Sequence, residues 1–176
     1  MEADPTRDEA AFRALYDRAA PRIHAYARTV GGWGELADDV VQETFMRYLA
    51  ASPPLMSEGQ TMAYLYKIAT RLTINRWRQR GRERRWLGAP AEDAALENVP
   101  ANPSAAELGL DMERALARLK PRDRALLWLV YVEGQSHRQA ARTMTLSETS
   151  VRVLLFRARR RLAAILDEAG LAPAAP

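Results

Sequence analysis

The sequence of 176 residues contains no cysteine and only two histidines. Disulfide bonds, thiolate metal sites and a cysteine nucleophile are therefore excluded, and the absence of cysteine fits a reducing cytosol. His24 has no second histidine or acid at ligand spacing, which favours a packing or surface role over a metal site. No spacing is typical of a nucleotide-binding loop or a catalytic nucleophile. We therefore expect a protein that is not an enzyme and binds no cofactor or metal.

Long apolar runs are also absent. No segment approaches the roughly 18 residues needed to span a bilayer, and the polar N-terminus lacks a signal-peptide core. We therefore expect a cytoplasmic protein without membrane insertion. Between Leu87 and Met112 there is no Lys or Arg, although the net charge of the chain is +4. The chain is thus basic, then acidic, then basic again, and its positive balance favours anionic partners such as nucleic acids.

Apolar periodicity predicts an all-α fold of two small helical domains joined by a flexible acidic linker. The N-terminal domain is expected over residues 8–86, the proline-containing linker over 87–110 and the C-terminal domain over 111–168. The expected helices are 8–30, 35–51, 61–85, 111–119, 121–132, one from Ser136 to Thr143 and one from Ser147 to Leu166. Ser136 and Ser147 are the expected N-caps of the last two helices, and Asp8 is a possible N-cap of the first. Pro21 is expected to kink or break the first helix.

The segment 61–85 carries a stripe rich in cations beside its apolar face. The stripe consists of Tyr64, Lys67, Arg71, Asn75 and Arg78. Cations interleaved with Tyr64, Tyr66 and Trp77 suit a nucleic-acid strand whose bases stack on aromatic rings. An isolated arginine cluster is as often a solvated face, so this segment alone does not distinguish nucleic-acid binding from a solvated surface.

The two last helices follow the helix-turn-helix pattern of a short helix, a tight turn and a long basic helix. If the front of the last helix enters a major groove, Glu148, Thr149, Ser150 and Arg152 can reach base edges. Phosphate contacts are expected from Arg157 and Arg159 in the same helix and from Arg138 in the helix before it. The alternative is a small helix bundle with a solvated basic face.

The helix 35–51 has an acidic surface formed by Asp38, Asp39, Gln42 and Glu43, opposite an inner face that includes Phe45 and Leu49. Adjacent helical residues point about 100° apart, so the two aspartates cannot converge on one metal ion. The surface is therefore either a protein-docking patch or a solvated face.

Two blocks of this sequence resemble bacterial RNA polymerase sigma factors of the small extracytoplasmic-function (ECF) class. ADDVVQETFMRYL is similar to the helix that docks on core RNA polymerase, and Asp39, Gln42, Glu43 and Phe45 match its pattern. AYLYKIATRLTINRWRQR resembles the adjacent segment that melts and reads the minus-ten element, and the segment from LARLKPRDR to ARRRL resembles the domain that reads the minus-thirty-five element.

The resemblance implies a subunit that directs promoter-specific initiation, with core RNA polymerase, promoter DNA and an anti-sigma factor as partners. The chain departs from the family pattern at Gln139, where Glu is usual, and at Thr145, where Gly is usual. Thr145 therefore demands either a positive φ from a β-branched residue or a different turn. Val153 and Leu154 replace polar groups near the DNA, and Asn75 replaces a common Asp.

Two other functions stay open from the sequence. One is a helix-turn-helix regulator that binds DNA without polymerase. The other is an interaction protein that occupies polymerase or a sigma inhibitor without starting transcription, which the altered recognition helix permits.

Overall fold

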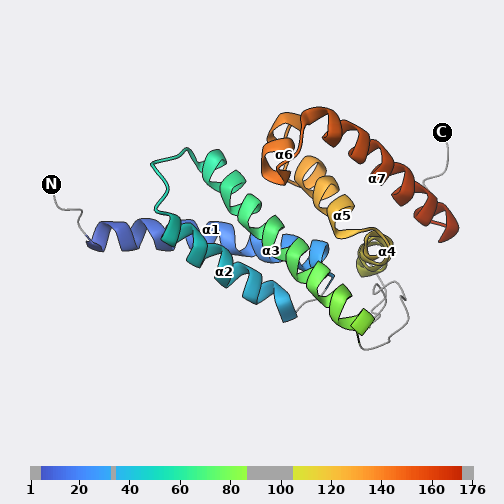
Figure 1. The fold of residues 1–176 in the computed structure, drawn as a ribbon, viewed down its shortest axis with the longest axis horizontal. Helices are drawn as coiled ribbons and strands as arrows, with labels where there is room; N and C mark the ends of the chain where they lie inside the picture. The colour runs from blue at the N-terminus through green and yellow to red at the C-terminus, as the bar shows by residue number, and fades with distance from the viewer. Residues whose placement is uncertain (1–4, 33–34, 87–104, 172–176) are drawn as a thin grey trace.

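The computed structural model describes residues 5–32, 35–86 and 105–171, which fold into helices and short connections (Figure 1). The N-terminal half contains α1 (Pro5–Gly31), α2 (Glu35–Ala51) and α3 (Glu58–Trp86). The C-terminal half contains α4 (Ala105–Ala117), α5 (Pro121–Leu127), the π-helical turn η1 (Trp128–Val132), α6 (His137–Met144) and α7 (Glu148–Glu168). These ranges hold no strand, which confirms the all-α fold. No helix within them is long and apolar enough to cross a membrane.

Several helix bounds differ from the sequence prediction. The helix 35–51 lies where it was expected, whereas α1 begins at Pro5, so Asp8 is not its N-cap, and runs on through Pro21 as one helix. The helix α4 begins at Ala105 rather than at Asp111, which shortens the predicted linker at its C-terminal end. The predicted helix 121–132 changes to a π-turn at Trp128. Most of the linker (87–104) lies outside the described residues.

Local side-chain chemistry fixes where α6 and α7 begin. Ser136 is the N-cap of α6 as predicted, and it forms a capping box: its backbone N–H donates to Gln139 Oε1 at 2.8 Å, and its Oγ accepts from the Gln139 N–H at 3.3 Å. A glutamine accepts this hydrogen bond as well as a glutamate does, so Gln139 does the same work as the usual Glu. Ser147 caps α7 in the predicted way, accepting from the Ser150 N–H at 3.1 Å.

The core of the N-terminal half lies between three helices. Ile23, Tyr26 and Val30 of α1 are fully buried against Leu65 and Tyr66 of α3. The helix α2 closes this core from one side, as Figure 1 shows. Burial of such side chains stabilises the fold by about 1.5–3 kcal/mol each.

The same core continues into the C-terminal half. Leu126 and Leu129 are fully buried in one cluster with the residues of α1 and α3. The ring of Trp128 lies edge-on to the ring of Tyr26, with their centroids 6.2 Å apart. In Figure 1, α5 lies between α3 and α7, which places α7 on the outside of the molecule. The two predicted domains are therefore packed into one body.

This packing changes the pKa of two buried tyrosines, Tyr26 and Tyr66. The Tyr26 hydroxyl bonds to Thr70 Oγ1 at 2.6 Å, and Thr70 in turn donates to the Tyr66 carbonyl at 2.6 Å. Because the single Thr70 proton goes to that carbonyl, Tyr26 is the donor to Thr70. The Tyr66 hydroxyl is buried with no hydrogen-bond partner among the described residues, although Glu133 lies beside it. Burial therefore raises the pKa of both tyrosines far above 10.

Alkaline pH should destabilise the fold through Tyr26 and Tyr66. Above pH 10 the unfolded chain loses both tyrosine protons while the folded chain keeps them, so each tyrosine lowers the free energy of unfolding by about 1.4 kcal/mol per pH unit. Burial lowers the pKa of Arg124 to about 10, so this one group acts in the opposite direction. The net loss is about 1.4 kcal/mol per pH unit, measurable by urea unfolding at several pH values above 10.

The variant Tyr26→Phe should remove most of this net pH dependence, since one tyrosine and one arginine then oppose each other. The exposed Tyr131 supplies the control, because Tyr131→Phe should leave the slope unchanged. An unaltered slope in Tyr26→Phe would contradict the assignment.

Candidate polymerase and nucleic-acid interfaces

The acidic surface predicted on α2 is present, and part of its charge is paired within the chain. Asp39 and Gln42 are exposed. Glu43 is half-buried and pairs with Arg47 at 2.6 Å and with Arg76 of α3 at 2.8 Å. Asp39 lies 3.9 Å from the same Arg76 guanidinium. The residues of this surface that are open to another molecule are therefore Asp38, Asp39 and Gln42, while Glu43 also connects α2 to α3.

Arg76 is a contributor that sequence reasoning missed. Arg76 follows the stripe residue Asn75 directly, so the sequence does not distinguish it from the other cations of α3. Only the packing of α3 against α2 shows that it faces Glu43.

Phe45 does not lie on the docking surface. Its side chain is buried. The centroid of its ring lies 4.7 Å from that of Tyr16 and 6.0 Å from that of Phe12, both on α1. It packs α2 against α1, as its predicted place on the inner face of the helix requires. Leu49, expected on the inner face, is instead half exposed.

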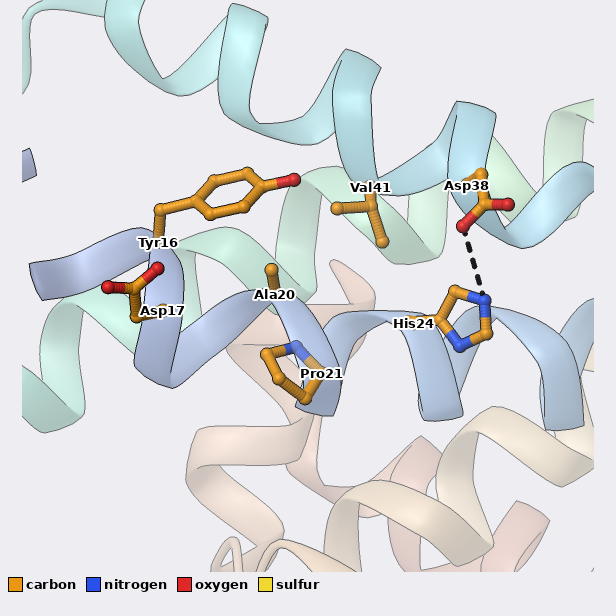
Figure 2. Close-up of a pocket in the computed structure, with 7 residues that line it drawn as sticks. All are labelled: Tyr16, Asp17, Ala20, Pro21, His24, Asp38 and Val41. Carbon is orange, nitrogen blue, oxygen red and sulfur yellow. Dashed lines mark ion pairs between the residues drawn. The ribbon is translucent and has the colours of Figure 1, made fainter. Parts of the chain in front are cut away.

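A shallow cavity of about 330 Å³ lies between α1 and α2, next to the acidic surface. Figure 2 shows Tyr16 and Ala20 of α1 and Val41 of α2 along it, with His24 reaching toward Asp38. The His24 Nε2 atom lies 3.4 Å from Asp38 Oδ1. Within the described ranges, no three His, Cys, Asp or Glu side chains gather as a metal site would require.

The stripe on α3 has the predicted exposure at its C-terminal end. Arg71, Asn75 and Arg78 are exposed, while Tyr64 and Lys67 are half-buried. The ring of Tyr64 lies 6.2 Å from the ring of Tyr48 on α2. Cations and one aromatic ring therefore share one face of α3.

The prediction that Tyr66 stacks on bases is wrong, because Tyr66 is a core residue, 1% exposed. Trp77 keeps partial exposure. The stacking surface of α3 is thus smaller than the sequence indicated.

The helix-turn-helix is formed by α6 and α7, and Thr145 makes the turn between them. Its φ of 56° and ψ of 52° are left-handed, so a β-branched residue occupies the conformation that usually requires glycine. The usual turn geometry of the motif is retained, and the backbone of Thr145 carries the strain of the left-handed conformation.

The polar residues at the front of α7 bond mainly to one another. Glu148 pairs with Arg152 at 2.7 Å and lies 3.7 Å from Arg138 of α6. The Ser150 hydroxyl bonds to Ser147 Oγ at 2.7 Å. Thr149 is exposed. DNA reading by Arg152 or Ser150 would therefore replace these internal contacts.

Further along α7, Arg157 and Arg159 are exposed, as a phosphate-contacting role requires. Val153 and Phe156 are exposed beside them, and the guanidinium of Arg160 lies 5.9 Å from the centre of the Phe156 ring. The helix thus presents cations and apolar groups on its open side.

Comparison with known proteins assigns these surfaces to one family. Residues 15–83 match the family described as Sigma-70 region 2, and residues 109–162 match Sigma-70, region 4. The ECF RNA polymerase sigma factor SigL of Mycobacterium tuberculosis is 31% identical over 166 residues, covering 93% of each chain. The chain belongs to the ECF sigma factors. As such, it directs transcription initiation by RNA polymerase.

Two further comparisons agree with this family. The ECF sigma factor SigE of Mycolicibacterium smegmatis is 31% identical over 168 residues, and the match covers 90% of this chain but 64% of SigE. The sigma factor RpoE of Bartonella quintana, solved in complex with the anti-sigma factor NepR, is 25% identical with a TM-score of 0.71, covering 89% of this sigma factor and 97% of RpoE. The region 2 match includes α2 and most of α3, and the region 4 match includes α6 and most of α7.

Replacing Thr145 with glycine should stabilise this sigma factor by about 1 kcal/mol, because glycine adopts a left-handed conformation without the clash of a β-carbon. Urea unfolding measures the change. Thr145→Ala is the matched control, since it loses the same hydroxyl but keeps the β-carbon. Equal stability of the two variants would show that Thr145 carries no backbone strain.

Proposed function

We propose that this sigma factor binds core RNA polymerase through the exposed part of α2 and promoter DNA through α3 and α7. The observation that carries this proposal is the distribution of exposed side chains: α2 offers Asp39 and Gln42, while α3 and α7 offer arginines. Acidic and amide groups suit a basic protein surface, and arginine faces suit phosphates. One chain can therefore contact a protein and a nucleic acid together.

The stripe on α3 is proposed to hold the opened minus-ten strand. Arg71 and Arg78 would contact phosphates, Asn75 a base edge, and Tyr64 and Lys67 the upstream end of the element. Unpairing and flipping a base costs a few kcal/mol, which stacking and phosphate contacts can offset. The helix α7 is proposed to hold the minus-thirty-five duplex, with Arg157, Arg159 and Arg138 on phosphates and the front of α7 toward the bases.

The chain itself is proposed to catalyse no reaction. Bond formation belongs to the polymerase, and the sigma factor contributes binding energy at two DNA elements. The complex of RpoE with NepR supports an anti-sigma factor as a further partner of this chain. Since bacterial core polymerase and promoters lie in the cytoplasm, the proposal also places this protein there.

Transcription in vitro tests the proposal directly. Purified chain, bacterial core polymerase and a library of candidate promoters should give transcripts from fixed start sites only when the chain is present. A stand-alone DNA regulator would instead bind duplex DNA tightly and leave core polymerase unchanged. Polymerase binding with no transcript from any promoter would favour a non-initiating interaction protein.

Asp39→Asn supplies the matching test of the docking surface. It removes one exposed charge with little change in shape, and it should weaken polymerase binding by about tenfold if Asp39 faces a basic group. The control is Asp167→Asn, which removes an exposed charge at the end of α7. Equal binding by both variants would contradict the role of α2.

Arg157 and Arg152 should differ in how they affect promoter binding by the polymerase complex. Arg157→Ala should weaken binding to all sequences, because Arg157 is assigned to phosphate. It should also reduce the slope of log K against log salt concentration by about one. Arg152→Ala should instead relax the preference for the minus-thirty-five sequence. Binding titrations on matched and mismatched promoters at several salt concentrations measure both, and a uniform loss in Arg152→Ala would reassign it to the backbone.

A further inference from the structure

The open side of α7 carries two large apolar side chains that the fold does not use, Val153 and Phe156, which we call the apolar pair. Val153 is 45% exposed and Phe156 is 60% exposed. The buried face of the same helix is formed by Val151, Leu155 and Ala158. At about 100° per residue, the two members of the pair lie about 60° apart, on the side opposite to that face. They are therefore not part of the core.

Arginines flank the apolar pair on both sides of the helix. Arg152 and Arg159 border it on one side and Arg157 on the other, and all three are exposed. The guanidinium of Arg160 lies 5.9 Å from the centre of the Phe156 ring, a distance typical of a cation–π contact. The open side of α7 is thus apolar along its middle and positively charged at both edges.

The position of α7 lets this side meet another molecule. In Figure 1, α7 runs along the outer edge of the molecule, and the helices that it contacts lie on its inner side. From Thr149 to Leu166 the helix contains no Asp or Glu. A single exposed apolar residue is ordinary at a protein surface, so exposure alone indicates no partner. An apolar pair in the middle of a basic face suits a partner that is apolar at its centre and anionic at both edges.

The major groove of duplex DNA has this chemistry. It is about 12 Å wide, admits one α-helix and is bordered by the phosphates of both strands. The base edges on its floor present hydrogen-bonding groups and one methyl group, the C5 methyl of thymine. The apolar pair is spaced by about 4.5 Å along the helix axis, close to the separation of about 3.4 Å between neighbouring base pairs. The two side chains can therefore reach methyl groups on neighbouring base pairs.

The polar groups beside the apolar pair are already engaged within the chain. Arg152 pairs with Glu148 at 2.7 Å, and the Ser150 hydroxyl bonds to Ser147 Oγ at 2.7 Å. Each of them would lose this contact in order to bond to a base. The apolar pair makes no hydrogen bond, so packing on a methyl group breaks none and removes apolar surface from water. Leu154 is half-buried and packs against the core, so it does not extend the pair.

We propose that Val153 and Phe156 set part of the promoter preference of this sigma factor, by packing on thymine methyl groups of neighbouring base pairs in the minus-thirty-five element. The inference rests on the proposed binding of α7 to that duplex, and it names the base that the helix selects. The arginines at both edges hold the phosphates, while the apolar pair distinguishes thymine from the other bases.

Deoxyuridine in place of thymidine tests the inference, because it removes the methyl group and keeps the hydrogen-bonding groups of the base. The minus-thirty-five element of a promoter that the chain transcribes is synthesised in both forms, with the minus-ten element unchanged. The complex of this chain with core polymerase should bind the thymidine form about fourfold more tightly for each methyl group contacted. Equal binding of the two forms, or a minus-thirty-five element without thymine, would overturn the inference.

Removing the apolar pair should remove the preference for thymidine. The double variant Val153→Ser with Phe156→Ser changes two exposed side chains, so the core stays intact, and it should bind both forms of the promoter equally. Val132→Ser is the matched control, because Val132 is 60% exposed in the π-helical turn and outside α7. It should keep the wild-type preference. A double variant that still prefers thymidine would assign the methyl contacts to other residues.

The variant Arg157→Ala separates a failure of this inference from a failure of the proposed function. If both forms bind equally and Arg157→Ala still weakens binding to all sequences, then α7 binds the duplex without reading methyl groups. If Arg157→Ala has no effect either, the proposed role of α7 in DNA binding is wrong. If both forms bind equally and the double variant loses affinity for core polymerase, the apolar pair binds protein instead of DNA.

Discussion

Trp128 packs its ring against Tyr26 while its indole nitrogen holds the carboxylate of Glu133, and the joining of the two halves depends on this contact. The π-helical turn Trp128–Val132 has Glu133 as its C-cap, three residues before Ser136, the N-cap of α6. An extra residue in a helical turn changes the direction of the side chains that follow. The apolar ring and the charged group thus reach α1 together.

The surfaces of this sigma factor show how one small chain keeps opposite charges apart. The acidic side chains of α2 are partly neutralised by Arg76 and Arg47, and Glu148 at the front of α7 is held by Arg152. Such internal pairs keep the charged groups in place at little energetic gain, since exposed pairs contribute about 0–1 kcal/mol. They also mean that a partner replaces contacts rather than meeting bare charges, which favours specificity over affinity.

The local features of the fold could be predicted from the sequence, because they depend on neighbours in the chain. The caps at Ser136 and Ser147 follow from side-chain chemistry within a few residues. At Thr145 the sequence left a left-handed residue and a different turn both open, and the structure shows the left-handed residue. Helical periodicity also placed the cation stripe on α3. It could not tell Tyr66 from Tyr64, because both border the apolar face and only the position of α1 decides which is buried. Periodicity placed Phe45 correctly on the inner face of α2, and only the family resemblance had assigned it to the docking surface.

The contacts between the halves left no signal in the sequence. Arg22 and Glu133 lie 111 positions apart, and nothing in their surroundings singles them out from other charged residues. The family resemblance described each half but not their packing against each other. Pairing of this kind depends on the tertiary arrangement, which a single sequence does not encode in any local pattern.

The buried guanidinium of Arg124 gives the contact between α5 and α1 a particular response to heat. Its Nε is buried without a hydrogen-bond partner among the described residues, so much of the lost hydration is not replaced. Hydration of a charged group becomes less favourable as the temperature rises, so the penalty for keeping Arg124 dry shrinks on warming. The hydrogen bond from Arg124 to the Thr29 carbonyl at the end of α1 therefore becomes relatively more favourable as the temperature rises.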